Sequence, residues 1–181
     1  MAGDEDERRK GEIEKMFAEF APKFPGAPTI TAEELVRDMA GTGALVIVDV
    51  RTREEQDVSM IRSAIRREDF EELKSEFKGH KVVAYCTIGY RSGQYVEKLR
   101  AEKFDAYNLK GSILSWTHAG GELERGSGDG EQVIKRVHTY GKNWDLASRE
   151  YEAVYHEKPA LAYVAGLVPD ALKPWTWFKK K

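Results

Sequence analysis

The sequence predicts an α/β fold with three layers, in which an open parallel sheet is flanked by helices. Two short apolar runs, residues 44–50 and 82–85, have the composition of strands covered on both faces. Helical patterns alternate with these runs, which is typical of a parallel sheet that binds ligands at the carboxyl ends of its strands. The 181 residues are enough for one such domain with additional segments. We therefore divide the chain into an N-terminal helical segment (1–28), an α/β domain (29–124) and a C-terminal extension (125–181).

The N-terminal segment is expected to form an amphipathic helix. One helical face, at the i, i+3, i+4, i+7 spacing, consists of Ile13, Met16, Phe17 and Phe20. Proline cannot continue a helix, and three prolines follow, at Pro22, Pro25 and Pro28. We expect the apolar face to cover the flank of the domain rather than to serve as an arm for a partner.

Inside the domain, the expected helices carry ordinary start and packing signals. Thr31 and Glu34 match a capping box, and Gly41 or Gly43 ends the helix that they begin. The inward face of this helix is expected to hold Leu35, Val36 and Met39. A later helix, which follows residues 86–91, is expected to bury Tyr95, Val96 and Leu99. A weaker strand, residues 106–109, comes next.

The C-terminal extension begins with a glycine-rich break at 126–130 and is then unusually aromatic. Its large aromatic residues are Trp144, Trp175, Trp177, Tyr140, Tyr151, Tyr155 and Tyr163. Residues 133–137 fit either a strand or a helical turn, and residues 145–155 fit a helix. We expect the tryptophans to pack the extension onto the domain. A surface for a protein partner is the alternative, because exposed aromatic side chains make good interface anchors.

Composition excludes several classes of protein. Lysine and arginine number 29 against 31 aspartates and glutamates, so a net charge of −2 predicts no binding to nucleic acid or to an anionic membrane. The lone Cys86 cannot form an intrachain disulfide or a zinc cluster, and the four histidines are scattered, so no metal is predicted. The start of the chain is acidic, unlike that of a signal peptide. No apolar run reaches the length of about 20 residues that a membrane-spanning helix needs. We expect a reducing, cytoplasmic location.

Cys86 is the candidate reactive group because it follows a buried strand and precedes a helix. The loop amides and the helix dipole favour an anion at this position. Gly89 permits a tight turn, Arg91 adds a permanent charge, and Ser92 is expected to cap the helix. An inert buried thiol is the alternative interpretation of an isolated cysteine. The neighbours favour a working thiolate, with a site formed by Cys86, Thr87, Ile88, Gly89, Tyr90, Arg91 and Ser92.

The loop pattern Cys86-x-x-Gly89-x-Arg91-Ser92 resembles the active-site loop of the rhodanese-like sulfurtransferases. That family typically shows Asp-Val-Arg, Glu-Glu-Tyr, Gly-His-Ile-Pro-Gly-Ala, Leu-x-Gly-Gly and a tryptophan. At the corresponding places this chain has Asp49-Val50-Arg51, Glu54-Glu55-Gln56, Ser59-Met60-Ile61-Arg62-Ser63-Ala64, Leu109-Lys110-Gly111-Ser112 and Trp116. The resemblance covers about residues 29–124. The loss of two glycines in residues 59–63 makes the backbone path there uncertain.

This resemblance implies a single rhodanese-like domain that carries sulfur on Cys86. The thiolate would attack the outer sulfur of thiosulfate or of a persulfide, and cyanide or a thiol would accept the sulfur from the Cys86 persulfide. No cofactor is implied. By analogy Asp49 would fix the loop through Arg91. Asp49 and Arg51 could equally form a structural salt-bridge network.

Two other functions remain open at this point. Phosphatases and arsenate reductases of the same fold have five residues between cysteine and arginine, whereas this chain has four, which fits one sulfur atom better than a phosphate. A non-catalytic docking or regulatory module that works through residues 125–181 is the main alternative. Within the loop Arg91 is the only cation. We therefore expect weak use of thiosulfate and a persulfide or a protein thiol as the natural partner.

Overall fold

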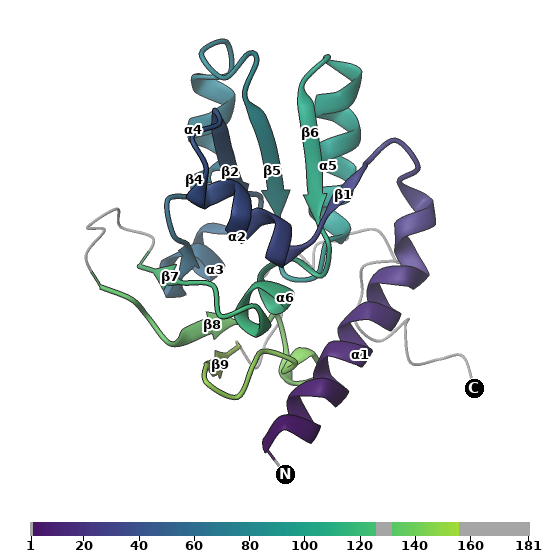
Figure 1. Cartoon of the computed structure of the whole chain (residues 1–181), viewed down its shortest axis with the longest axis vertical. Helices are drawn as coiled ribbons and strands as arrows, with labels where there is room; N and C mark the ends of the chain where they lie inside the picture. The colour runs from purple at the N-terminus through teal and green to yellow at the C-terminus, as the bar shows by residue number, and fades with distance from the viewer. Residues whose placement is uncertain (1, 126–131, 156–181) are drawn as a thin grey trace.

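A five-stranded parallel sheet forms the centre of the computed structural model, which describes residues 2–125 and 132–155 (Figure 1). The strand order is β1 (Thr29–Ile30), β6 (Asp105–Leu109), β5 (Lys81–Tyr85), β2 (Leu45–Asp49) and β4 (Ile65–Arg66). All four pairings are parallel. β2 and β5 are almost completely buried, as their apolar runs predict.

Helices cover both faces of the sheet, so the predicted three-layer α/β fold is confirmed. One hydrophobic cluster joins the sheet to α1 (Ala2–Phe20), α2 (Ala32–Ala40) and α6 (Ser112–His118). The cluster on the other face joins it to α4 (Arg67–Glu72) and α5 (Tyr90–Ala101). The remaining helical elements of the described residues are α3 (Arg53–Val58) and two 3-10 turns, η1 (Ala21–Lys23) and η2 (Lys142–Trp144).

The signals for the helix that begins after Thr31 are confirmed, with one exception. Thr31 and Glu34 form both hydrogen bonds of the capping box at the start of α2. Leu35 is buried and Met39 is partly buried, but Val36 is 40% exposed, so its predicted inward orientation is wrong. A nine-residue helix on the sheet buries only a narrow stripe, and Val36 lies beside that stripe.

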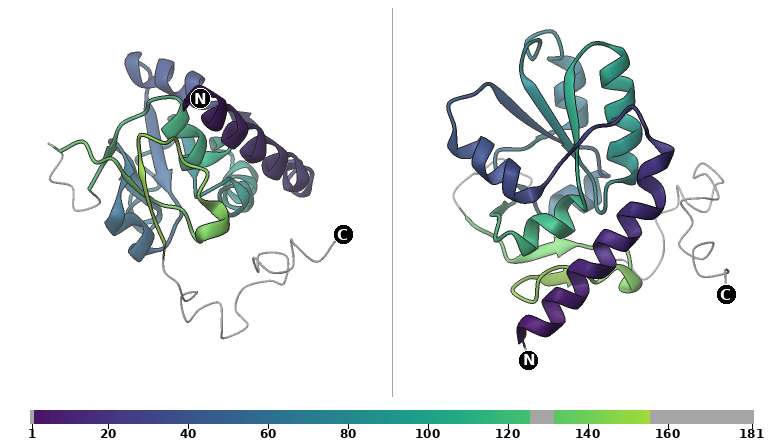
Figure 2. Two further views of the ribbon diagram at one scale, coloured as in Figure 1. Left: turned by 90° about the horizontal axis from the view of Figure 1, so that it is seen from below. Right: turned by 45° about the vertical axis from the view of Figure 1, so that its right-hand side comes forward.

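Helix α1 packs along the flank of the domain, as the apolar face predicts (Figure 2). Ile13, Phe17 and Phe20 are buried, and Met16 is partly buried. The rings of Phe17 and Phe20 meet edge to face at 5.3 Å, and Phe20 meets Tyr90 at 5.5 Å. Because Tyr90 begins α5, the N-terminal helix directly contacts the loop that carries Cys86.

Two small sheets lie near the carboxyl ends of the central strands. β3 (Met60–Ile61) pairs antiparallel with β7 (Leu123–Glu124), and this pairing defines the backbone path that the sequence left uncertain. β8 (Arg136–His138) pairs parallel with β9 (Glu152–Val154). Figure 1 shows β8 and β9 beyond the arrowheads of β5 and β6, next to the loops of the candidate site.

The helix predicted over 145–155 is wrong. Residues 145–151 follow an irregular path after the 3-10 turn η2 (Lys142–Trp144), and β9 comes next. The reason is tertiary, since backbone groups of this segment bind other elements: Ala147 O accepts from Arg9, and Ser148 N donates to Thr117 Oγ1. Of the two interpretations of residues 133–137, the strand is the better, although β8 begins only at Arg136.

The aromatic residues of the extension are placed only in part. Trp144, Tyr140 and Tyr151 belong to the main hydrophobic cluster or pack against it, as expected. The predicted glycine-rich break at 126–130 and the residues Tyr163, Trp175 and Trp177 lie outside the described residues.

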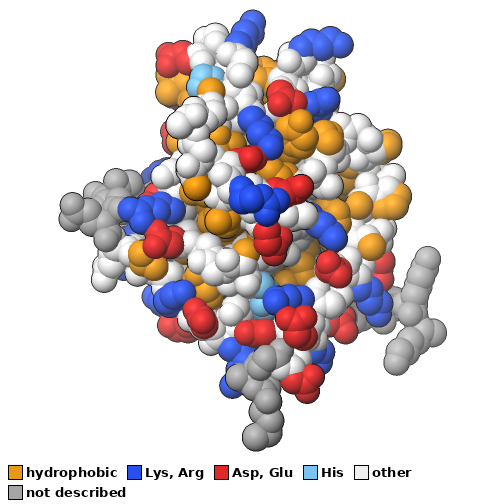
Figure 3. All heavy atoms as spheres, viewed as in Figure 1, with side chains coloured by type: hydrophobic (Ala, Val, Ile, Leu, Met, Phe, Trp, Pro, Cys, Tyr) orange, Lys and Arg blue, Asp and Glu red, His pale blue; other side chains and the backbone are white. Residues whose placement is uncertain are grey.

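Charges of both signs are interspersed on the face drawn in Figure 3, in keeping with the near-neutral composition. Among residues 2–125 and 132–155, no helix is long and apolar enough to cross a membrane. The same part of the chain contains no cluster of three histidine, cysteine, aspartate or glutamate side chains suited to a metal ion.

Phe17→Ala should destabilise the protein by about 3 kcal/mol, because it removes a buried ring that packs against the domain and the Cys86 loop. Urea denaturation followed by tryptophan fluorescence measures this change. Glu19→Ala, at an exposed position on the same helix, is the matched control and should shift the free energy of unfolding by less than about 0.5 kcal/mol. Equal stabilities of the two variants would show that α1 is not part of the folded unit.

Candidate active site

The loop that carries Cys86 connects β5 to α5 and turns at Gly89. Gly89 has φ +111°, a conformation that side chains disfavour, and it is the N-cap of α5. A Cβ atom here would also lie 2.7 Å from a ring carbon of Phe17. The expected need for glycine is therefore confirmed on two grounds, backbone conformation and the close approach of α1.

Ser92 is not the helix cap that the sequence predicts. The helix begins at Tyr90, because Gly89 accepts the left-handed conformation and its carbonyl receives the Gly93 N–H. Ser92 therefore lies in the first turn of α5, where its hydroxyl is 3.5 Å from Cys86 Sγ and donates to Asn108 Oδ1 at 2.7 Å. Its single proton can turn to the sulfur when the sulfur carries a charge.

Polar groups surround the sulfur atom, although Cys86 is only 2% exposed. Gly89 N–H donates to Sγ at 3.1 Å, and Ser112 Oγ lies 4.0 Å from it. Ser112 Oγ also accepts a hydrogen bond of 3.1 Å from the Cys86 N–H. The sulfur is thus held in a cradle of donors and is not sealed among hydrocarbon side chains.

The cradle changes the acidity of the thiol. Burial by itself raises the pKa of Cys86, because a buried thiolate loses its water. The charge of Arg91 and the hydrogen bonds from Ser92 and Gly89 outweigh burial, so the net pKa is lowered. A larger fraction of this thiol than of an ordinary cysteine is therefore thiolate at neutral pH.

Arg91 pairs with Glu55 of α3. Two hydrogen bonds of 2.7 and 2.8 Å join the guanidinium to the carboxylate, and Thr87 Oγ1 binds both partners at 3.2 and 3.1 Å. Burial raises the pKa of Glu55, but the charge and hydrogen bonds of Arg91 hold it well below its usual range. The expectation that Asp49 fixes the loop through Arg91 is corrected: Glu55 does this.

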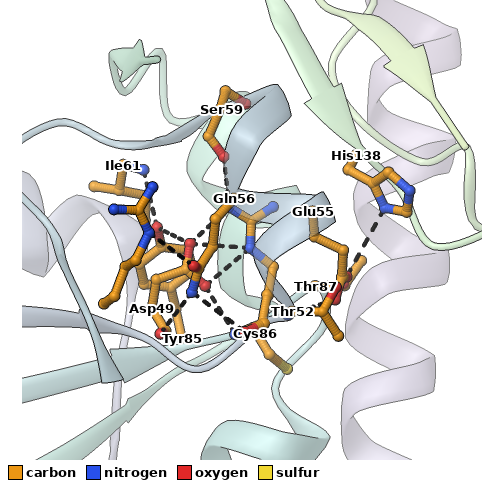
Figure 4. A network of polar contacts seen from close by, with 12 residues as sticks. Asp49, Thr52, Glu55, Gln56, Ser59, Ile61, Tyr85, Cys86, Thr87 and His138 are labelled. Carbon is orange, nitrogen blue, oxygen red and sulfur yellow. Dashed lines mark hydrogen bonds and ion pairs between the residues drawn. The ribbon is translucent and has the colours of Figure 1, made fainter. Parts of the chain in front are cut away.

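Asp49 forms a buried ion pair with Arg51 and also contacts Tyr85, which Figure 4 labels beside it. Arg51 Nη2 and Tyr85 Oη donate to Asp49 Oδ2 at 2.7 and 2.6 Å. Tyr85 Oη in turn accepts the Ile61 N–H at 3.0 Å. These contacts tie the end of β2 to β5 and β3, which is the structural role that the sequence left open for Asp49 and Arg51.

The structure thus brings together the seven loop residues that the sequence assigned to the site. Four of them, Thr87, Ile88, Tyr90 and Arg91, line a pocket of about 30 Å³ together with Cys86. Gly89 and Ser92 do not line the pocket but contact the sulfur atom. Asp49 and Arg51 do not line the pocket.

Sequence reasoning missed several residues of the site. Asn108, on β6, accepts from Ser92 and donates to Gly89 O at 2.8 Å, so it fixes the loop from the neighbouring strand. From the extension, Tyr140 and Trp144 complete the lining of the pocket, and His138 Nδ1 lies 3.8 Å from Glu55 Oε1. The only available sequence signal was the position of Asn108 in the strand before Leu109.

The family model described as the rhodanese-like domain matches residues 31–119. The chain belongs to the rhodanese-like family. The matched range lies within the predicted domain 29–124, whose outer limits stay a prediction. It includes the whole Cys86 loop and Glu55 but not Tyr140 or Trp144.

Several solved structures are similar to this rhodanese-like chain. A rhodanese-like domain protein from Staphylococcus aureus is 30% identical, with 54% of this chain and 98% of that one covered and a TM-score of 0.45. A rhodanese-like domain from Anabaena is 28% identical, with coverages of 54% and 79% and a TM-score of 0.48. A Rhodopseudomonas palustris protein of unknown function, described as a possible tyrosine phosphatase, is 23% identical, with coverages of 62% and 93% and a TM-score of 0.49. No curated protein matches the chain.

Ser92→Ala should raise the pKa of Cys86, because it removes a hydroxyl that stabilises the thiolate. The alkylation rate at neutral pH should therefore fall several-fold, because a smaller fraction of the thiol is ionised. The rate of alkylation by iodoacetamide, followed from mildly acidic to alkaline pH, measures the pKa, and every alkylation event reports on Cys86 because the chain has one cysteine. Ser75→Ala, at an exposed position, is the control. Identical pH profiles for the two variants would contradict the assignment.

Proposed function

We propose that this rhodanese-like chain is a sulfurtransferase that carries sulfur as a persulfide on Cys86. The observation that supports this most directly is the sulfur cradle at the carboxyl end of β5: an amide donor at 3.1 Å, a hydroxyl at 3.5 Å, and a lowered pKa. An inert buried cysteine needs none of these features. The proposal includes a reducing compartment, such as the cytoplasm, because a cysteine that works as a free thiol must be protected from oxidation.

The proposed reaction is a double displacement at sulfur. The Cys86 thiolate attacks the outer sulfur of a persulfide R–S–SH, the S–S bond of the donor breaks, and R–S⁻ leaves while Cys86–S–SH forms. With thiosulfate the leaving group is sulfite. In the second step cyanide or a thiolate attacks the outer sulfur of the Cys86 persulfide and regenerates the thiolate. Atoms and charges balance without a cofactor, because the cysteine itself is the carrier.

Phosphoryl or arsenate chemistry is less well supported by this site. The four residues between Cys86 and Arg91 leave a pocket of about 30 Å³, which is small for a tetrahedral oxyanion with five heavy atoms. Arg91, which would bind such an anion, is already held by both oxygens of Glu55. We therefore rank a phosphatase or arsenate reductase below a sulfurtransferase.

A docking or regulatory module is the second candidate function. It is favoured by one observation: Cys86 is 2% exposed, and two aromatic side chains of the extension line the pocket over it. The protein partner would then bind the extension. The cradle around the sulfur is the reason that we place the enzyme first.

Incubation with a polysulfide should add the mass of one sulfur atom to the native chain and none to Cys86→Ser. Intact-mass spectrometry measures the gain, and a reducing agent should reverse it, because the added sulfur is bound through an S–S bond. If no donor adds sulfur to the folded native chain, the sulfurtransferase proposal fails and the docking module is favoured.

Glu55→Gln should improve the use of thiosulfate. The substitution keeps the size of the side chain but removes the negative charge that offsets Arg91, so the site gains net positive charge for a doubly charged donor. We expect the KM for thiosulfate to fall about tenfold, which corresponds to about 1.4 kcal/mol. Steady-state thiocyanate production measures it. Glu54→Gln, at an exposed position on the same helix, is the control. An unchanged KM in Glu55→Gln would show that charge pairing at Arg91 does not limit thiosulfate binding.

A further inference from the structure

The pocket over Cys86 is shared between the rhodanese-like domain and the extension. On the domain side its lining comes from the loop, and on the extension side from Tyr140 and Trp144. The two rings lie 5.2 Å apart between centroids and are tilted by 43°. Both residues lie outside the range matched by the family model, 31–119. These two residues, which we call the aromatic wall, therefore come from outside the part of the chain that the family model covers.

The wall is held by the fold and is not a loose segment. Trp144 is 7% exposed, and its backbone N–H donates to Gly141 O at 2.9 Å. The strand that leads to the wall, β8, is anchored by Ser59 Oγ, which donates to Arg136 O at 2.6 Å. Thr139 N, just before the wall, donates to Val154 O on β9 at 2.9 Å. The position of both rings is thus fixed relative to the Cys86 loop.

The backbone at Tyr140 adds an independent observation. Its φ is +70°, in the left-handed region that bulky side chains rarely adopt. Such strain persists only where the surrounding structure enforces it, and it gathers at functional sites. In this chain the strained turn is the one that brings the Tyr140 ring to the pocket.

From this geometry we infer that Tyr140 and Trp144 determine which sulfur donor reaches Cys86. The wall admits the narrow end of a thiol persulfide, R–S–SH, and rejects a donor with a tetrahedral anionic group, such as thiosulfate. This inference rests on the proposed sulfurtransferase function and names its substrate class. Both residues are specificity determinants and not catalytic residues.

Shape and charge give the same preference. The outer sulfur of any donor must reach Cys86 Sγ, so the atoms next to that sulfur lie at the wall, where the pocket is narrow, with a volume of about 30 Å³. The second sulfur of a persulfide is divalent and polarizable, and sulfur contacts aromatic rings favourably. A sulfonate group is wider, and aromatic side chains do not replace the water that its negative charge loses on entering the pocket. The positive charge of Arg91 is already paired with Glu55.

The test compares two reagents on the full-length chain, in which Cys86 is the only thiol. Iodoacetamide is compact and neutral, and 2-sulfonatoethyl methanethiosulfonate carries a tetrahedral anionic group. For each variant the second-order rate of Cys86 modification is measured with both reagents. Removal of the wall should shift the ratio of the two rates at least tenfold toward the sulfonate reagent. The ratio of kcat/KM for thiosulfate and for a small-molecule persulfide should shift in the same direction.

Two variants remove the wall in different ways. Trp144→Ala removes the larger ring. Tyr140→Gly removes the other ring and at the same time suits φ +70°, so it should fold even if Trp144→Ala does not. Leu146→Ala is the matched control, because it removes a buried side chain of the same segment that does not line the pocket. Trp144→Phe keeps an aromatic ring and should retain most of the native ratio.

The outcomes separate the inference from the proposed function. An unchanged reagent ratio in folded Tyr140→Gly, or an equal shift in Leu146→Ala, overturns the role of the wall. A shifted reagent ratio in a chain that takes up no sulfur from any donor supports control of access by the wall but removes the sulfurtransferase. A native chain that prefers thiosulfate over persulfide overturns the assigned substrate class.

Discussion

A cysteine sulfur that is almost out of reach of water, and whose pKa is nevertheless lowered, is the feature on which this site depends. Burial alone raises the pKa of Cys86, so a thiolate persists only where the protein replaces the lost water with fixed donors and a positive charge. The Gly89 amide, the Ser92 hydroxyl and Arg91 supply these. Arg91 in turn needs a carboxylate, which Glu55 provides through two hydrogen bonds. The loop, α3 and α5 are therefore linked through one buried charge arrangement.

Three serines stand where the family pattern has glycine, and one of them, Ser112, contacts the Cys86 loop. Ser63 and Ser112 stand where the family pattern has glycine, and both keep a left-handed backbone, with φ +64° and +51°. The fold evidently requires this conformation, and a serine adopts it at some cost. At Ser112 a hydrogen bond offsets this cost, because the hydroxyl oxygen accepts the Cys86 N–H. Ser59 replaces a third glycine in extended backbone, where its hydroxyl binds β8 of the extension.

Local signals in the sequence were enough to predict the parallel sheet, the capped helix after Thr31 and the turn at Gly89. Each depends on residues that are near one another in the chain: an apolar run, a capping box, a glycine after a strand. The pairing of Arg91 could not be found in this way. The sequence analysis assigned Asp49 to Arg91 by analogy, but in the folded chain Glu55 on α3 pairs with Arg91, and Asp49 pairs with Arg51.

The C-terminal extension shows more clearly why local sequence patterns are not enough, because its conformation depends on the elements that it contacts. Residues 145–155 have a helical pattern, yet their backbone groups bind α1, α6 and β8. Phe17 of α1 packs against Gly89, and Trp144 lines the pocket from the other flank. The reactive loop of the rhodanese-like domain is thus packed from both sides by segments outside the family's range. The shared domain supplies the chemistry of Cys86, and the two flanks decide how tightly the loop is held and what can approach it.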